Sequence, residues 1–455
     1  MCIRDRLLSA NAYLGALPVA RALEMGADVV ITGRCVDSAV TLGALMHAFG
    51  WKADAYDRLA QGGLAGHIIE CGCQATGGLF TDWESVPGWE NMGYPIVECA
   101  ADGSFVVAKP AGTGGLITPA VVAEQMLYEI GDPAAYILPD VVCDFTQVTM
   151  TQEGENRVRV AGARGAPPTD SYKVSATYMD GWRAQAQLLV TGIDAAKKAR
   201  RSGEAILART RAMFGKLKFA DYLDSHIEVL GAEHQYGPHA RTQAVREAIV
   251  RVTVRHENPK ALGVFAREVA PAGTSWAPGT TGAGGGGRGK PSPNVRLFSL
   301  LLPKGAVRAH VALGAQRVEV EIPRGQAGSA PVRIEGLRQE TPAGELVEVP
   351  LVRVAHGRSG DKGNISNIGI IARQPGYLPV LRAQLTPEAV KAYLAHLVKG
   401  EAQRYELPGI HAFNFVLREA LDGGGMASMR VDPLGKGMAQ ILLDMPVRVP
   451  RAWLG

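Results

Sequence analysis

The chain has 455 residues, of which 47% are hydrophobic, and this allows two or three domains with buried cores. Its formal net charge of +4 is spread along the sequence, with no basic face interleaved with aromatic residues, which argues against a nucleic-acid partner. No apolar run approaches the roughly 18 residues of a membrane span, and no apolar signal peptide opens the sequence, so we expect a cytoplasmic protein without a membrane partner. The six cysteines are sparse and irregularly spaced, which favours reduced thiols over a disulfide framework.

Residues 1–145 predict a doubly wound α/β part built on a parallel sheet. Helical spacing predicts a helix over residues 14–25, and residues 29–32 have the β-branched content of a buried parallel strand. Asp37 or Ser38 can then cap a second helix. Because such a part should begin with a strand, we expect that the opening strands are missing and that the first few residues are foreign.

The same pattern continues as far as residue 145 with short strands and one more helix. The predicted strands are residues 67–71, 105–108 and 140–143. Thr118 is the expected N-cap of the helix, with Pro119 at its first position and Gly131 at its end.

Residues 146–335 predict an α+β part with mixed or antiparallel strands. The predicted strands are residues 158–160, 172–176, 183–190, 249–255 and 296–302, with a helix over residues 194–214. Residues 273–293 are of low complexity and include four consecutive glycines at 284–287. This stretch is either a flexible linker or a lid that orders on a ligand. Arg288 and Lys290 are the residues that support the second interpretation.

A polar, poorly periodic stretch at residues 324–347 predicts a domain boundary. It separates the N-terminal domain, residues 1–335, from a compact unit over residues 348–450. In that unit Thr386 should cap an amphipathic helix. Residues 413–421 form a second, short amphipathic segment, and residues 429–431 and 440–444 are predicted strands. Strands with two helices on one face predict a small ferredoxin-like α+β domain.

Residues 356–370 contain the densest set of functional residue types in the chain. Predicted strands at 350–355 and 368–372 flank about ten residues of glycine-rich loop, more than a plain hairpin turn requires. Glycines let backbone N–H groups approach an anion, while Arg358 and Lys362 add positive charge. Asp361 and Lys362 are a candidate acid/base pair. The alternative is a long hairpin in which Asp361 caps backbone N–H groups and Lys362 is solvated.

Two further anion sites are predicted where the chain enters a helix. Arg34 lies at the expected carboxyl end of a parallel strand and can pair a carboxylate or phosphate, while Asp37 either acts on the substrate or is only an N-cap. The backbone of Gly112, Thr113, Gly114 and Gly115, together with Lys109, can cradle an anion. Neither GxxxxGK[ST] nor GxGxxG occurs here, so no standard nucleotide-binding motif is present.

The cysteines give weaker indications of chemistry. Cys71 and Cys73 lie near His67, but a single tight pair without a second cluster favours structural thiols over zinc, and we expect no metal site. A nucleophilic cysteine at position 35, 71 or 73 stays open. No Gly-x-Ser-x-Gly motif occurs, which disfavours serine acyl transfer.

Several of these motifs, in order, resemble the acyclic terpene utilisation protein AtuA family. Residues 32–43 (TGRCVDSAVTLG), 70–82 (ECGCQATGGLFTD), 109–115 and 273–302 carry the resemblance. Residues 358–363 and 367–369 resemble the family's C-terminal ferredoxin-fold domain, which is a separate small protein in some relatives. The sequence departs from the family at its front, where the family's glycine-rich first strand has no counterpart.

The resemblance implies bacterial breakdown of citronellol- and geraniol-type terpenes through CoA thioesters, with a lyase-type cleavage of a branched 3-hydroxyglutaryl-CoA. Such a cleavage needs a base for the hydroxyl proton and a positive or N–H pocket for the enolate. The candidate catalytic residues are Asp37, Asp361 and Lys362. The candidate ligand-binding residues are Arg34, Lys109, Gly112, Thr113, Gly114, Gly115, Arg358, Ser359, Asn364 and Asn367.

An expectation of a different class is a non-catalytic subunit that binds a ligand or a partner of the acyl-CoA pathway. In either case the expected partner is a small acyl-CoA or another anion. We expect no cofactor apart from CoA as part of the substrate, and a homo-oligomer stays open.

Overall fold

The computed structural model describes residues 3–282, 289–326 and 337–454. The described chain divides into two compact units, each assembled from segments that are distant in sequence. Unit 1 comprises residues 1–9, 176–298 and 420–434, and unit 2 comprises residues 10–175, 299–419 and 435–455. The four glycines and Arg288 of the predicted linker or lid lie outside the described residues, as does part of the predicted boundary. Within the described ranges, no helix combines the length and the apolar character needed to cross a bilayer.

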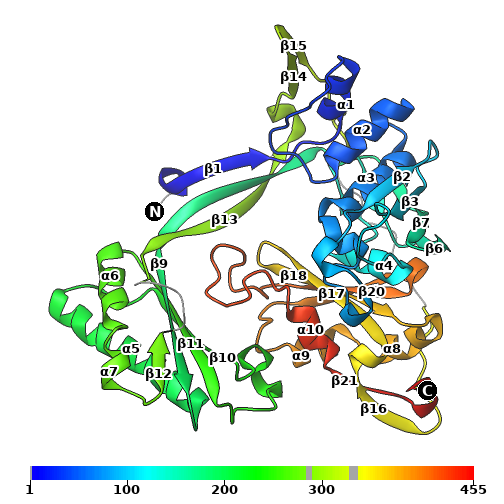
Figure 1. Ribbon diagram of the computed structural model, residues 1–455. Coiled ribbons are helices and arrows are strands. Elements are labelled where there is room, and N and C mark those ends of the chain that lie inside the picture. The colour runs from blue at the N-terminus through cyan, green and yellow to red at the C-terminus, as the bar shows by residue number, and fades with distance from the viewer. Residues whose placement is uncertain (1–2, 283–288, 327–336, 455) are drawn as a thin grey trace. The chain divides into compact units, whose positions relative to one another are not determined.

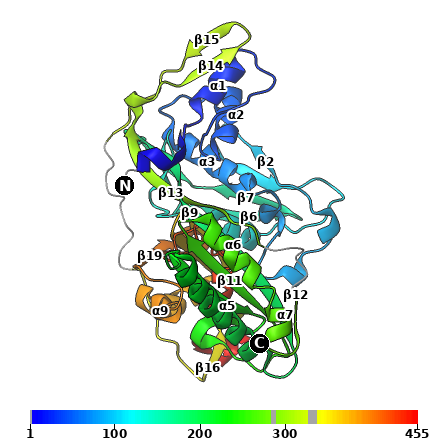
Figure 2. The same ribbon diagram turned by 90° about the vertical axis from the view of Figure 1, so that its left-hand side faces the viewer.

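Unit 1 is an antiparallel sheet covered by helices. Strand β11 pairs with β9 on one side and with β10 on the other, and Figure 2 shows helices α5 and α6 lying against this sheet. Its elements are β10 (Asp224–Leu230), β11 (Glu247–His256), β12 (Thr280–Gly282), η1 (Ile3–Arg6), η5 (His234–His239), α5 (Ala195–Leu217), α6 (Pro259–Glu268) and α7 (Ala272–Ser275). Strands β1 (Leu7–Ala12), β9 (Ser171–Thr191) and β13 (Ser292–Pro303) begin in one unit and end in the other. The antiparallel pairing predicted for this region is confirmed.

The first part of unit 2 combines α-helices and short 3-10 helices with two small sheets. Figure 1 shows the sheet of order β2-β3-β7-β6, and the other sheet has the order β4-β5-β8. The helices are α1 (Leu17–Glu24), α2 (Ala39–Phe49), α3 (Tyr56–Glu70), α4 (Pro119–Leu127), η2 (Gly72–Thr76), η3 (Trp83–Ser85), η4 (Trp89–Asn91) and η6 (Lys304–Ala306). The strands are β2 (Ile96–Cys99), β3 (Phe105–Ala108), β4 (Tyr136–Ile137), β5 (Val142–Asp144), β6 (Thr149–Gly154), β7 (Arg157–Ala161) and β8 (Arg164–Ala166), with a separate hairpin of β14 (His310–Leu313) and β15 (Gln316–Glu319).

The prediction of a doubly wound parallel sheet in this part is wrong. Both of its sheets pair antiparallel throughout their described strands. Residues 29–32 form no strand, and the side chains of Val29 and Ile31 are 78% and 93% exposed. Residues 67–70 belong to α3, which is buried on all sides from Leu59 to Ile68. A helix buried all round loses its amphipathic period, and its apolar run then looks like a short buried strand.

The rest of unit 2 is an antiparallel sheet of order β17-β18-β20-β19, accompanied by short helices and a β16–β21 pair. The strands are β16 (Leu346–Pro350), β17 (Ala355–Lys362), β18 (Ile365–Ala372), β19 (Ala402–Leu407), β20 (Ala412–Leu417) and β21 (Pro446–Pro450). The helices are α8 (Leu378–Gln384), α9 (Pro387–Tyr393), α10 (Met438–Leu443), η7 (Leu351–Arg353), η8 (Pro375–Tyr377), η9 (Pro408–Ile410) and η10 (Arg451–Leu454). Three predictions for residues 348–450 are wrong: residues 413–417 form a buried strand, residues 429–431, which belong to unit 1, lie outside any helix or strand, and residues 440–443 are helical.

The glycine-rich stretch at 356–370 is a tight hairpin and not a long loop. Lys362 pairs with Ile365, so Gly363 and Asn364 alone make the turn between β17 and β18. The glycines within the strands serve close packing. A Cβ atom on Gly360 would lie 2.8 Å from the ring of Tyr128, and one on Gly369 would lie 2.5 Å from Cβ of Leu127. Gly360 and Gly369 therefore lie where the end of α4 approaches the sheet, and a side chain at either position would overlap with it (Figure 1).

Two buried asparagines of the sheet hold the chain at the end of α4. The Asn367 side chain donates to the carbonyl of Leu127 at 2.6 Å and accepts from the N–H of Glu129 at 2.9 Å. It also donates to Oδ1 of Asn414, whose own amide donates to the carbonyls of Ile130 and Gly131 at 3.0 and 2.6 Å. The carbonyl of Leu127, which the end of the helix leaves without a helical partner, and the carbonyls of Ile130 and Gly131 beyond it accept from two side chains of neighbouring strands.

We expect Asn414→Ala to lower the free energy of unfolding by about 3 kcal/mol, because it removes the donor to the carbonyls of Ile130 and Gly131 and one of the two acceptors of the Asn367 amide. Urea denaturation followed by circular dichroism measures the change. Gln403→Ala removes an exposed amide from β19 of the same sheet and should change stability by less than about 0.5 kcal/mol. Equal effects of the two substitutions would contradict this role.

Candidate functional site

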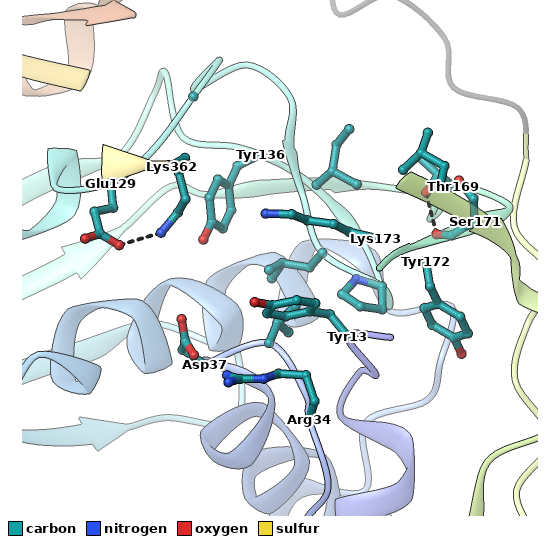
Figure 3. A pocket seen from close by; sticks show the side chains of 16 residues that line it. Tyr13, Arg34, Asp37, Glu129, Tyr136, Thr169, Ser171, Tyr172, Lys173 and Lys362 are labelled. Atoms are coloured by element: carbon teal, nitrogen blue, oxygen red, sulfur yellow. Dashed lines mark hydrogen bonds and ion pairs between the residues drawn. The ribbon is translucent and has the colours of Figure 1, made fainter. Parts of the chain in front are cut away.

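One cavity of about 470 Å³ in unit 2 is lined by Arg34, Asp37 and Lys362, three of the site residues predicted from the sequence (Figure 3). Its size lies within the range usual for small-molecule sites. The full lining is Tyr13, Arg34, Val36, Asp37, Glu129, Gly131, Tyr136, Ile137, Leu138, Pro139, Thr169, Ser171, Tyr172, Lys173, Leu301 and Lys362. Polar side chains therefore converge on a wall that is otherwise largely apolar.

Backbone hydrogen bonds through residues 13 and 14 bring two of the cations together. The Tyr13 N–H donates to the carbonyl of Lys173 at 2.9 Å. Leu14 then pairs on its other side with the loop before α2, donating to the carbonyl of Arg34 at 3.2 Å and accepting from Val36 N–H at 2.9 Å. The Tyr13 ring consequently lies 5.2 Å from the Arg34 guanidinium carbon and 5.5 Å from Lys173 Nζ. Both cations gain cation–π contact with one ring.

Asp37 faces this cavity and is not the cap of α2. The N-cap is Ser38, and its side chain makes no capping hydrogen bond. Asp37 also lines a more open hollow next to the first, which shares Arg34 and adds Glu70. In Figure 3 the Asp37 carboxylate lies across the cavity from the amino group of Lys173. An exposed carboxylate beside cations suits proton transfer or substrate orientation better than helix capping.

Lys362 reaches the cavity from the tip of the β17–β18 hairpin and forms an ion pair there. Its Nζ lies 2.5 Å from Oε2 of Glu129, and Lys436 Nζ lies 2.8 Å from Oε1 of the same carboxylate. Burial disfavours the charge of Glu129, but the two lysines outweigh it and lower the pKa of Glu129 to about 2. Lys436 also lies 3.0 Å from Asp361, so Asp361 takes part in this network and does not line the cavity.

Tyr136 contributes a neutral hydroxyl to the lining. Burial raises the pKa of Tyr136 well above its ordinary value, so its phenol stays protonated and can donate a hydrogen bond. In Figure 3 this hydroxyl and the amino groups of Lys173 and Lys362 point into the same space. The site therefore offers several donors to an anion. Three cationic side chains line it against the two carboxylates of Asp37 and Glu129.

Four of the predicted ligand-binding residues lie elsewhere in the hairpin and outside the cavity lining. Arg358 is buried, donates to Gln74 and lies 4.9 Å from the centre of the Tyr128 ring. Ser359 is also buried, donating to the carbonyl of Gly435 at 2.7 Å and accepting from the N–H of Ala439 at 2.9 Å. Asn364 lies in the turn and Asn367 holds the end of α4, so these positions support the fold.

The loop at residues 112–115 is likewise separate from the cavity lining. The N–H groups of Gly114 and Gly115 donate to the carbonyls of Asn91 and Pro87, both at 2.8 Å. Lys109 donates to the carbonyl of Thr113 at 2.6 Å, and the Thr113 hydroxyl donates to Pro110. Two of the four backbone donors that were expected to cradle an anion thus bind residues 87 and 91, and the amino group of Lys109 binds within the loop.

Cys71, one of the three cysteine candidates, lies in a setting that differs from that of an activated thiol. Burial, reinforced by a 2.8 Å hydrogen bond to Glu70, raises the pKa of Cys71 to about 12. A thiol with so high a pKa is a poor nucleophile. The five described cysteines are free, in agreement with the expected reduced thiols.

Sequence patterns missed Tyr13, Lys173, Tyr136 and Glu129. Lys173 is the exposed position between buried Tyr172 and Val174, so it looked like an ordinary solvent-facing residue of a predicted strand. Tyr13 was assigned no role because its position depends on pairing with a segment 160 residues away. One indication for Lys173 is present in the sequence: apolar and charged residues alternate over 172–174, which predicts that Lys173 lies on the opposite face of the strand from Tyr172 and Val174.

The carboxyl of Glu124 is buried and lies outside the cavity lining. Glu124 accepts from the Thr81 hydroxyl at 2.6 Å and from the Thr81 N–H at 3.2 Å, and Thr81 also accepts from Gly357 N–H at 3.0 Å. Burial raises the pKa of Glu124 to about 7, despite these hydrogen bonds and the charge of Arg358. Below about pH 7 the protein therefore keeps a protonated glutamate at the contact between α4 and β17.

This carboxyl predicts a fall in stability with rising pH. In the unfolded chain Glu124 loses its proton near pH 4.5, whereas in the folded protein it does so near pH 7. Between these values the folded state binds more protons, so the free energy of unfolding decreases as the pH rises. Urea denaturation from pH 4.5 to 7 should show wild type losing up to about 3 kcal/mol relative to Glu124→Gln. Glu84→Gln, at an exposed site, should follow wild type, and parallel curves for wild type and Glu124→Gln would contradict the assignment.

Comparison with known proteins gives two family matches. The model described as acyclic terpene utilisation family protein AtuA matches residues 2–313, and the model described as AtuA ferredoxin-like domain matches residues 349–448. No curated protein and no solved structure matches the chain. The first match includes every residue that lines the cavity except Lys362, which falls within the second.

Proposed function

Because the chain belongs to the acyclic terpene utilisation AtuA family, we propose that its cavity binds a branched acyl-CoA thioester with a free carboxylate. The apolar wall of Val36, Ile137, Leu138 and Leu301 suits a branched hydrocarbon chain. The cations Arg34 and Lys173 suit the carboxylate, since an ionised partner makes a hydrogen bond roughly twice as strong. The observation that carries the proposal is the meeting of Arg34, Asp37, Lys173 and Lys362 around one cavity.

The proposed reaction is the cleavage of a 3-hydroxyglutaryl-CoA derivative between its second and third carbons. Asp37 takes the proton of the 3-hydroxyl group, and the electrons of the broken carbon–carbon bond move to the thioester carbonyl as an enolate. Protonation of that enolate yields acetyl-CoA, and the other product is a 3-oxo acid. Lys173, Lys362 and the Tyr136 hydroxyl are the groups available to stabilise the negative oxygen.

Asp361 is the weaker of the two candidate bases. It lies 3.0 Å from Lys436 and does not line the cavity, whereas Asp37 does. Lys362 also has a carboxylate partner, Glu129, which fixes its position and offsets its charge. These ion pairs favour a role for Lys362 in orienting a ligand over a role as a proton acceptor. They also support the binding-subunit alternative, in which no bond is cleaved.

Substitution of the base separates catalysis from binding. Purified protein is incubated with a 3-hydroxy-3-alkylglutaryl-CoA, and acetyl-CoA release is followed by liquid chromatography and mass spectrometry. Asp37→Asn should lower kcat about 100- to 10,000-fold, the range for a lost general base, with little change in the Kd for substrate. Asp361→Asn should retain activity within about tenfold. A wild-type protein that binds the thioester without turnover would favour the binding subunit, and an inactive Asp361→Asn beside an active Asp37→Asn would reverse the assignment.

Removal of a cavity cation tests ligand binding on its own. Lys173→Met should weaken binding of the acyl-CoA about 10- to 100-fold by calorimetry, because one charge-assisted hydrogen bond contributes about 1.5–3 kcal/mol. Lys109→Met is the matched control, since Lys109 binds the Thr113 carbonyl and does not line the cavity. Stronger weakening by Lys109→Met than by Lys173→Met would move the site to the loop at 112–115.

A further inference from the structure

We propose that unit 1 carries a binding site for a divalent transition-metal ion, formed by His226, Glu228 and His234. The site uses residues of unit 1 alone, whereas the proposed function uses residues of unit 2, so the two proposals stand or fall separately. The ligand chemistry, two imidazoles and one carboxylate, is the set that zinc and similar borderline ions take in proteins. These residues differ from Cys71, Cys73 and His67, the group for which the sequence raised a zinc site and disfavoured it.

The geometry brings three ligand atoms to one point. His226 and Glu228 are two residues apart on β10 and therefore face the same side of the strand, and His234 begins η5 just beyond its end. One ligand atom from each of the three lies within 4.8 Å of the others. His226 Nε2 lies 3.6 Å from Oε1 of Glu228, close to the ~3.4 Å that separates two ligands bound tetrahedrally at ~2.1 Å. Small side-chain rotations are enough to enclose an ion.

The carboxylate is held in place by its own partners, as metal ligands usually are. Arg251, which is buried like Glu228, pairs with Oε2, and the N–H of Val431 donates to Oε1 at 2.9 Å. Arg251 also donates to the carbonyl of Met429. Such outer contacts orient a ligating carboxylate and make a site rigid. Arg251 occupies the far oxygen, so Oε1 is the atom that faces the imidazole of His226.

Simple ion pairing accounts for this cluster less well. Arg251 already balances the charge of Glu228, so the carboxylate does not require a protonated histidine for neutralisation. Nevertheless two imidazoles converge on it, with ring centres 6.0 Å apart. Neutral imidazoles present lone pairs, and an ion between them would be bound by both. The His226 side chain is 33% exposed, which leaves a path for the ion and room for a water as fourth ligand.

Metal titration tests the site directly and does not depend on enzymatic activity. Protein free of any histidine tag is treated with a chelator, dialysed, and titrated with ZnCl₂ by calorimetry and with CoCl₂ by visible absorption. Wild type should bind one Zn²⁺ per chain at this site. His226→Ala and His234→Ala should each weaken binding at least about 100-fold. His239→Ala, from the same η5 segment, should bind as wild type does.

Three results would overturn the proposal: no Zn²⁺ binding by wild type, unchanged binding by the His226→Ala and His234→Ala double variant, or a thiolate charge-transfer band in the Co²⁺ spectrum. The last would assign the ion to cysteines instead. Circular dichroism of each variant confirms that loss of binding is not loss of folding. Because His226 and His234 are partly exposed, their replacement leaves the buried Glu228–Arg251 pair intact.

Discussion

The hydrogen bonds of Asn367 and Asn414 to the end of α4 are the interaction on which much of unit 2 depends. They supply partners for the carbonyls of Leu127, Ile130 and Gly131, of which the first two belong to buried residues. They also hold the N–H of Glu129, a residue in the left-handed region with a φ of 59°. An L residue adopts that conformation only where its surroundings impose it. The same turn then leads through Gly131 and Tyr136 into the wall of the cavity.

This arrangement links the charge in the cavity to the packing of the sheet. Glu129 is fixed by a side chain of β18, and it in turn binds Lys362 at the hairpin tip and Lys436 ahead of α10. Glu129 therefore partly neutralises the charge of Lys362, one of the two lysines that line the cavity. The lining has two carboxylates, Asp37 and Glu129, and Glu129 pairs with Lys362. Arg34 and Lys173 are therefore the cations best placed to attract an anion.

The sequence predicted local structure where the determining contacts are local. The Thr118 cap of α4, the Thr386 cap of α9, helix α5 and the alternating strand β11 all formed close to the expected residues. It failed where burial on every side removes periodicity, as in α3 and β20, and where glycines serve packing instead of a loop, as in β17 and β18. In the cavity, Arg34 and Asp37 were found from their place before a helix. Lys173 and Tyr13 were not, because only long-range strand pairing brings them there.

The absence of a side chain at Gly360 and Gly369 limits the substitutions that the protein can tolerate at these positions. A methyl group on Gly360 would fall 2.6 Å from Cγ of Glu129, and one on Gly369 would meet Leu127. Relief of these overlaps requires the Glu129 side chain or the end of α4 to move, which would disturb the position of Glu129 beside Lys362. Two positions with no side chain and no place in the cavity lining thus bear on the ion pair between Glu129 and Lys362, and through it on the charge of the cavity wall.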